Sequence, residues 1–218
     1  MVINHESARY KRERLGLSLG ERHNGAYYYS REICKNIIPR VRTARNWLTV
    51  DYVGAKPFDH AIAFVHNNEH PEHYKEWAGL DAVLVCGVRE TVDKVKDYGK
   101  AIYLPLSIDV EYVRKYTAEK TRDVCYAGRK AKMQGVPASV DILTDLPRDL
   151  MLAELARYRR VYAVGRLALE AIALGCEVLP YDKRYPDVSV WRLLDNRDAA
   201  IMLQKELDII DGRTKCTI

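Results

Sequence analysis

The sequence predicts an α/β protein with two Rossmann-like parallel-sheet domains, one over residues 1–112 and one over residues 120–218. Short apolar runs alternate with helical segments in the first part of the chain, and the same alternation restarts after residue 123. Strands that alternate with helices in this way form a parallel sheet covered on both faces. The charged segment 111–123, EYVRKYTAEKTRD, separates the two parts as a linker or bridging helix. We therefore expect the two domains to face each other across a cleft, which is the natural place for a ligand.

The first domain begins with a polar and basic stretch. Residues 1–24 predict a loop around one weak strand, because glycines punctuate the segment. Apolar positions at helical spacing follow over residues 26–41, and Pro39 is expected to end that helix. The remaining elements are four strands at 46–53, 61–67, 81–87 and 101–109, and two helices at 71–79 and 89–99 that close at Gly79 and Gly99.

The second domain repeats the pattern of short strands and helices. Its apolar runs are each four to six residues long, which is typical of strands buried in a parallel sheet. A longer helical stretch closes the chain and is assigned to this domain. The expected strands are 124–128, 140–144, 161–164 and 177–182, and the expected helical segments are 148–158, 165–175 and 187–210.

The composition is that of a soluble globular protein. Hydrophobic residues make up 48% of the 218 residues and charged residues 30%. The longest apolar runs are much shorter than the roughly 20 residues needed to cross a bilayer, so we expect no membrane span. The first residues are charged where a secretory signal needs an apolar core, which predicts a cytoplasmic protein.

Charge and cysteine content narrow the choice of partners. The formal net charge of +5 favours anionic ligands, such as a nucleotide or nucleic acid. The five cysteines are odd in number and widely spaced, and four of them lie inside apolar runs. This pattern predicts buried free thiols, and it indicates neither a disulfide framework nor a zinc ribbon.

Residues 161–182, VYAVGRLALEAIALGCEVLPYD, carry the strongest functional signal. A strand that ends in a glycine turn and opens into a helix presents free backbone N–H groups and the positive helix end, which favour a phosphate. Gly165 allows a ligand to approach the backbone closely. Glu170 lies about one and a half turns into the helix, where its carboxylate can accept hydrogen bonds from vicinal ribose hydroxyls. The alternative for Glu170 is a solvated helix residue.

This segment resembles the donor-binding segment of GT-B-fold glycosyltransferases, which transfer sugars from nucleotide-sugars and commonly read E-x-F-G-x4-E-A-x-A-x-G-x-P-V. Tyr162 stands at the position of the first glutamate in many retaining members, while Val164 and Glu177 replace the Phe and the Pro. The resemblance therefore implies nucleotide-sugar binding and leaves open whether the enzyme inverts or retains configuration. The matching positions are Gly165, Glu170, Ala171, Ala173, Gly175 and Val178.

Two further stretches resemble the same family. AIYLPLSIDVEYV matches the P-x-G-x-D segment at the end of the first domain through Pro105 and Asp109. RDVCYAGRKAK resembles the strand that opens the second domain, and there Arg129 with Lys130 or Lys132 would neutralise the donor diphosphate. A surface loop is the alternative for these basic residues. The donor-binding residues that the resemblance implies are Arg129, Lys130, Lys132, Gly165, Arg166 and Glu170.

The resemblance also implies the co-substrates. The donor is a nucleotide-sugar, no other cofactor is expected, and the acceptor, a protein, a glycan or a nucleic acid, stays unidentified. Enzymes of this fold generally need no metal, and the chain has no D-x-D signature to hold a divalent ion beside a diphosphate. Two alternatives stay open: a nucleotide-sugar epimerase of the same architecture, and a non-catalytic Rossmann-like module that binds nucleic acid or protein.

A second cluster of polar residues follows the apolar run at 61–65. His66, Glu69 and His70 spell H-x-x-E-H, a zinc pattern that requires a helix, but a strand precedes the cluster and Pro71 follows it. A general base is the better interpretation, because a side chain at the carboxyl end of a sheet strand faces the ligand cleft. His66 is the first candidate catalytic base and Glu69 the second, and a plain polar loop is the alternative.

Overall fold

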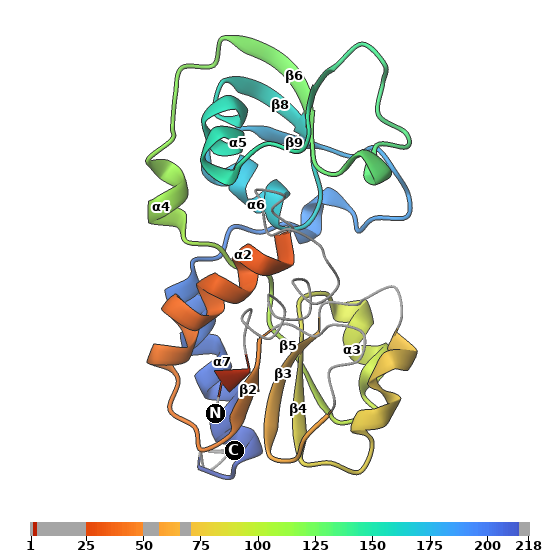
Figure 1. Ribbon diagram of the computed structural model, residues 1–218, viewed down its shortest axis with the longest axis vertical. Coiled ribbons are helices and arrows are strands. Elements are labelled where there is room, and N and C mark those ends of the chain that lie inside the picture. The colour runs from red at the N-terminus through yellow and green to blue at the C-terminus, as the bar shows by residue number, and fades with distance from the viewer. Residues whose placement is uncertain (1, 4–24, 50–56, 66–70, 214–218) are drawn as a thin grey trace, which may run out of the picture. The chain divides into compact units, whose positions relative to one another are not determined.

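The computed structural model describes residues 2–3, 25–49, 57–65 and 71–213, and it confirms an α/β protein with parallel sheets (Figure 1). Its contacts form two compact units. Unit 1 comprises Met1–Leu19, Ala26–Leu106 and Asn196–Ile218, and unit 2 comprises Gly20–Gly25 and Ser107–Asp195. The arrangement of the two units around a cleft stays a prediction.

Unit 1 contains a five-stranded parallel sheet whose strands follow the order of the chain. Its strands β3 (Ala61–Val65) and β4 (Ala82–Cys86) are buried along their whole length, as expected for the continuous apolar runs AIAFV and AVLVC. The strands are β1 (Val2–Ile3), β2 (Asn46–Leu48), β3 (Ala61–Val65), β4 (Ala82–Cys86) and β5 (Lys100–Tyr103), and they pair in that order.

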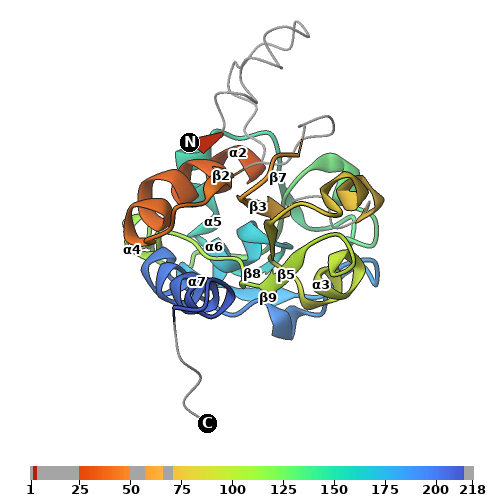
Figure 2. The same cartoon turned by 90° about the horizontal axis from the view of Figure 1, so that it is seen from below.

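Helices cover both faces of this sheet. Figures 1 and 2 show α2 (Gly25–Glu32) and α7 (Asn196–Ile210) on one side and α3 (Arg89–Val95) on the other. On the α2 side, the Tyr29 ring meets the Phe64 ring edge-on at 6.2 Å between centroids. On the other side, Tyr74 and Trp77 are buried with Ala63 and Leu84 in one apolar cluster. Alternate residues of each strand therefore supply the two layers of the core.

Two segments of unit 1 that were expected to be α-helices contain π-helical or 3₁₀-helical turns instead. The helix expected over 26–41 is α-helical only to Glu32 and continues as η1 (Ile33–Ile37), a π-helix, and η2 (Ile38–Arg40), a 3₁₀ turn. Pro39 has no backbone N–H, so the α-helical ladder cannot continue past it. The segment η3 (Pro71–Trp77) is a 3₁₀-helix, whose three-residue period places Tyr74 and Trp77 on the same buried side.

The C-terminal helix α7 makes its contacts in unit 1, whereas the sequence pattern assigned residues 196–218 to the second domain. Helix α7 packs against η1 and η2. Asn196 Nδ2 donates to Glu32 Oε2 at 2.9 Å in a buried site, and Asp211 accepts from the Arg45 guanidinium at 2.9 Å. The apolar face of α7, formed by Ala199, Ala200, Leu203 and Leu207, is buried.

Unit 2 contains a four-stranded parallel sheet in the order β7-β6-β8-β9. Helix α5 (Arg148–Leu155) leads from β7 to β8, and α6 (Arg166–Ala173) leads from β8 to β9. The expected linker begins with a short helix, α4 (Val110–Arg114), and its last two residues already belong to β6. Residues 187–195 contain only the 3₁₀ turn η5 (Val188–Val190). The strands are β6 (Arg122–Ala127), β7 (Asp141–Leu143), β8 (Tyr158–Tyr162) and β9 (Glu177–Leu179).

Candidate functional site

The carboxyl edge of the unit 2 sheet brings together most of the predicted donor-binding residues. All four strands are parallel, so the segments that follow them emerge at the same edge. Gly128 and the basic loop follow β6, Gly165 follows β8 after two residues, and the segment from Pro180 follows β9. This edge is the usual ligand-binding edge of an open parallel sheet.

Gly165 forms the N-cap of α6 and has the backbone angles φ 64° and ψ −135°. This conformation strongly favours glycine because it strains any side chain. A Cβ atom at Gly165 would meet no described heavy atom within 4 Å, so open space lies beside the backbone. The carbonyl of Gly165 accepts from the N–H groups of Ala168 and Leu169 at 3.1 and 3.4 Å. The turn therefore starts the helix and leaves room next to it.

Glu170 is buried, with only 3% of its surface exposed, so the alternative of a solvated helix residue does not hold. Arg166 donates to Glu170 Oε1 from Nε at 3.0 Å and from Nη2 at 2.9 Å. Arg148, the first residue of α5, donates to the same oxygen from Nη2 at 3.0 Å. Within the described part of the chain, Oε2 accepts no hydrogen bond. Two arginines thus fix the carboxylate and leave its second oxygen as an acceptor.

Arg148 is the member of this cluster that the sequence did not indicate. Its guanidinium lies 5.1 Å from the centroid of the Tyr112 ring, within the range of a cation–π interaction. The hydroxyl of Tyr112 donates to Asp149 and lies 3.2 Å from the hydroxyl of Tyr116. Burial and the neighbouring Asp149 raise the pKa of Tyr112. No spacing rule connects Arg148 to Glu170, because they come from different helices.

The basic loop after β6 is exposed at Arg129 and Lys130. The hydroxyl of Tyr126 donates to the backbone carbonyl of Arg129 at 2.7 Å and ties the loop to the end of its strand. Lys132 is half-buried, and its ammonium lies 5.1 Å from the centroid of the Tyr185 ring. The loop therefore places one cation beside an aromatic side chain and two in solvent.

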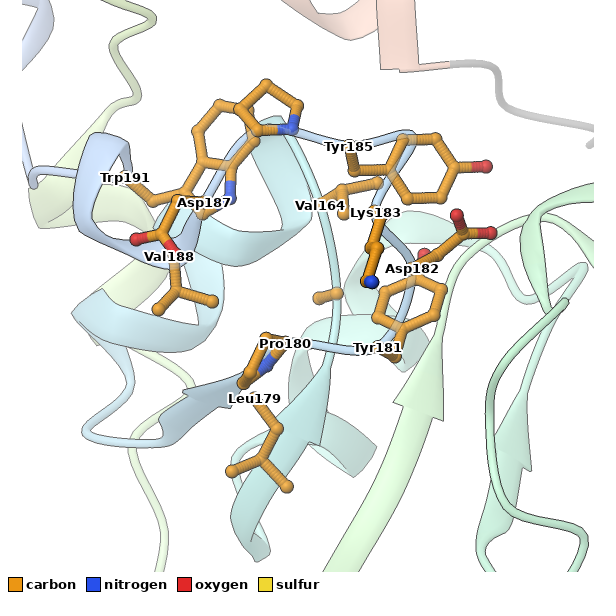
Figure 3. A pocket seen from close by; sticks show the side chains of 12 residues that line it. Val164, Leu179, Pro180, Tyr181, Asp182, Lys183, Tyr185, Asp187, Val188 and Trp191 are labelled. Atoms are coloured by element: carbon orange, nitrogen blue, oxygen red, sulfur yellow. The ribbon is translucent and has the colours of Figure 1, made fainter.

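A cavity of about 510 Å³ opens between the segments that follow β8 and β9. Figure 3 shows Trp191 and Val188 on one side of it and Tyr181, Tyr185 and Asp182 on the other. This cavity is not predictable from the sequence, because YDKRYPDVSVW contains no recognised motif. The lining residues are Ala163, Val164, Leu179, Pro180, Tyr181, Asp182, Lys183, Tyr185, Pro186, Asp187, Val188 and Trp191.

Aromatic contacts organise one wall of this cavity. The Tyr181 ring lies 5.9 Å from the rings of Tyr126 and Tyr162, and 5.6 Å from that of Tyr185, between centroids. Burial raises the pKa of Tyr126 to about 12, so this hydroxyl stays protonated. Arg184 hydrogen-bonds Asp182 and holds the pKa of that carboxyl below its usual range. The wall is thus aromatic, with an ion pair at its border.

The remaining predicted residues have different outcomes. His66 and Glu69, the candidate bases, lie outside the described residues, as does His70. Asp109 caps α4, where its carboxylate accepts from the N–H of Tyr112 at 2.9 Å. In the described ranges, no group of three His, Cys, Asp or Glu side chains is placed to hold a metal ion. Cys86, Cys125 and Cys176 are buried free thiols.

Comparisons with known proteins add nothing to the class that the fold indicates. The chain matches no family model, no curated protein and no solved structure at a significant level. Among the described residues, no helix is long and apolar enough to cross a membrane. The fold and the site define an α/β protein with two parallel sheets and a polar, aromatic-lined site at the carboxyl edge of one of them.

Proposed function

We propose that this protein is a glycosyltransferase that moves a sugar from a nucleotide-activated donor to an acceptor. The observation that carries the proposal is the arrangement directly after β8: a glycine turn with open space, followed by a buried carboxylate that two arginines hold in place. Nucleotide-binding α/β proteins commonly use a glycine turn for the phosphates and a carboxylate for the ribose. A carboxylate with one oxygen already fixed is pre-organised for that contact.

In this proposal unit 2 binds the donor. Glu170 Oε2 accepts hydrogen bonds from the ribose hydroxyls, and the phosphates lie near the backbone of Gly165. Arg129, with Lys130 or Lys132, offsets the negative charge of the diphosphate, and Arg166 adds a cation at the start of α6. These contacts strengthen as charge develops on the leaving group, which is how they speed the reaction.

The transfer step then needs a base. An acceptor hydroxyl oxygen attacks the anomeric carbon, the bond from that carbon to the phosphate oxygen breaks, and the nucleoside diphosphate leaves with the bonding electron pair. The acceptor proton passes to His66, or to Glu69 in the alternative assignment. Replacement of the catalytic base should lower transfer by about 100-fold or more and leave donor binding near the wild-type value.

Calorimetric titration of the purified protein with nucleotide-sugars tests the donor site. Glu170→Gln should weaken donor binding, because it replaces the charged acceptor by a neutral amide. Glu154→Gln is the matched control, because Glu154 is another helical glutamate that forms ion pairs with two arginines. Its carboxylate oxygens lie 3.5 Å from Arg122 Nη1 and 3.6 Å from Arg157 Nη1. Equal effects of the two changes on donor affinity would remove Glu170 from the donor site. Conversion of the donor sugar without any acceptor would favour the epimerase instead.

A further inference from the structure

Helix α7 has a second apolar face, on the side opposite the one that packs into unit 1. Ile201 and Ile209 are 56% and 55% exposed, and Met202 is 38% exposed. The helix turns by about 100° per residue, so these three side chains lie on the side that points away from its buried residues. An apolar side chain alone on a surface is ordinary, whereas apolar side chains gathered on one helix face indicate an interaction surface.

Two charged side chains lie on the same side of α7. Asp198 and Lys205 are seven residues apart, which is nearly two full turns, so both point in almost the same direction. They are about 10 Å apart along the helix axis, too far to pair with each other. Both are exposed, and neither forms an ion pair within the described part of the chain. Midway between them lie Ile201 and Met202. The outer face of α7 thus comprises Asp198, Ile201, Met202, Lys205 and Ile209.

The order of charges on the outer face of α7 is complementary to itself in one orientation. When two such helices lie antiparallel, around a two-fold axis at the level between Ile201 and Met202, Asp198 of each lies opposite Lys205 of the other. The isoleucine and methionine side chains of both helices then meet at the centre. A parallel pair would instead place like charges opposite each other. Antiparallel helix dipoles favour the first arrangement as well.

We propose that the protein forms a two-fold symmetric dimer in which the outer faces of two α7 helices pack antiparallel. This inference is independent of the proposed glycosyltransferase activity. The partner we infer is a second copy of the chain, because the same five side chains supply both the matching charges and the apolar centre. The contact involves one helix from each copy, so we expect a weak dimer that forms at high protein concentration.

Sedimentation velocity of the full chain at increasing concentration tests the proposal. The mass should rise from that of one chain towards that of two. Asp198→Lys or Lys205→Glu places like charges opposite each other at both ends of the helix pair, so each change should raise the dissociation constant by about 10-fold or more. Lys94→Glu is the matched control, because Lys94 is an exposed lysine on α3 of the same unit. This change should leave the dissociation constant as it is in wild type.

A mixture of the two charge variants gives the sharpest result. Asp198→Lys in one chain and Lys205→Glu in the other restore opposite charges at both ends, so the mixed proteins should form a dimer as strong as that of wild type. Neither variant should do so alone, and cooperative urea unfolding shows that each is folded. A wild-type chain that stays monomeric up to about 0.5 mM overturns the inference. A dimer that both single changes leave intact, or variants that stay monomeric when mixed, also overturns it.

Discussion

Arg166 donates two hydrogen bonds to Glu170 one helical turn further along α6, and it keeps only 10% of its side chain exposed. Arg148, 11% exposed, makes the third hydrogen bond to the same oxygen. The carboxylate therefore has a structural role as well as the proposed ribose contact, because it offsets two largely buried positive charges.

Glu170→Ala should destabilise unit 2. The change leaves two largely buried guanidinium groups without their carboxylate, and the loss of one partner from such an arrangement costs about 3 to 5 kcal/mol. Glu170→Gln keeps an acceptor oxygen and should cost less. Urea unfolding of the two variants and of wild type measures the difference. Equal stability of all three proteins would show that the arginines do not depend on Glu170.

Gly165→Ala should separate backbone strain from ligand contact. The positive φ of 64° makes a side chain costly by about 1 to 3 kcal/mol, although a Cβ has space there. Gly79→Ala is a matched control, with φ +85° and equal space, in unit 1. Both changes should lower the free energy of unfolding, but only Gly165→Ala should weaken nucleotide binding. Loss of binding in both variants would point to a general effect of stability.

Arg129→Ala should lower turnover with a nucleotide-sugar more than it weakens binding of the bare nucleoside. The guanidinium matters most when charge develops on the departing diphosphate. Arg159→Ala, which removes another exposed arginine from unit 2, is the control for net charge. Steady-state kinetics and nucleoside titration give the two quantities. An equal loss for nucleoside and nucleotide-sugar would indicate a structural role for Arg129.

Asp81 should contribute to stability in a pH-dependent way. His60 Nδ1 and Arg45 Nη1 each lie 3.0 Å from its carboxylate, and together they lower its pKa to about 2. The pKa of Asp81 in the folded protein is thus lower than the value of about 3.9 for an aspartate in the unfolded chain. The ionised Asp81 therefore stabilises the folded state fully above about pH 3.9, and this stabilisation is lost as the pH falls towards 2. The stability gap between wild type and Asp81→Asn should therefore narrow between pH 5 and pH 2.5 in urea unfolding. The side chain is 40% exposed, so solvent screening keeps the gap small. A gap that is constant with pH would contradict the ion-pair account.

The alternation of strands and helices was predictable from sequence because fully buried strands appear as continuous apolar runs. AVLVC and AIAFV are strands as predicted, and the helix after Gly165 begins where the glycine turn places it. The position of α7 was not predictable from its own pattern. Its apolar face through Ala199, Leu203 and Leu207 shows that it packs against something, but not against which sheet.

The candidate site was predictable only where one segment contains both the turn and the charge. Gly165 and Glu170 lie in one continuous strand–turn–helix segment, so their spacing in the sequence indicates a candidate binding motif. Arg148 and Trp191 reach the site from segments distant in the chain, through tertiary contacts that no local pattern encodes. The burial of Glu170 depends in part on Arg148, which comes from another helix, whereas Arg166 lies one turn earlier on the same helix.

Titration calorimetry of the wild-type protein with UDP-, GDP- and ADP-sugars tests the central claim most directly. The account predicts saturable binding of at least one of these donors, with an affinity that falls in Glu170→Gln and stays unchanged in Glu154→Gln. Absence of binding to every nucleotide-sugar, in a protein whose folding is verified by cooperative urea unfolding, would contradict the assignment of unit 2 as a donor site.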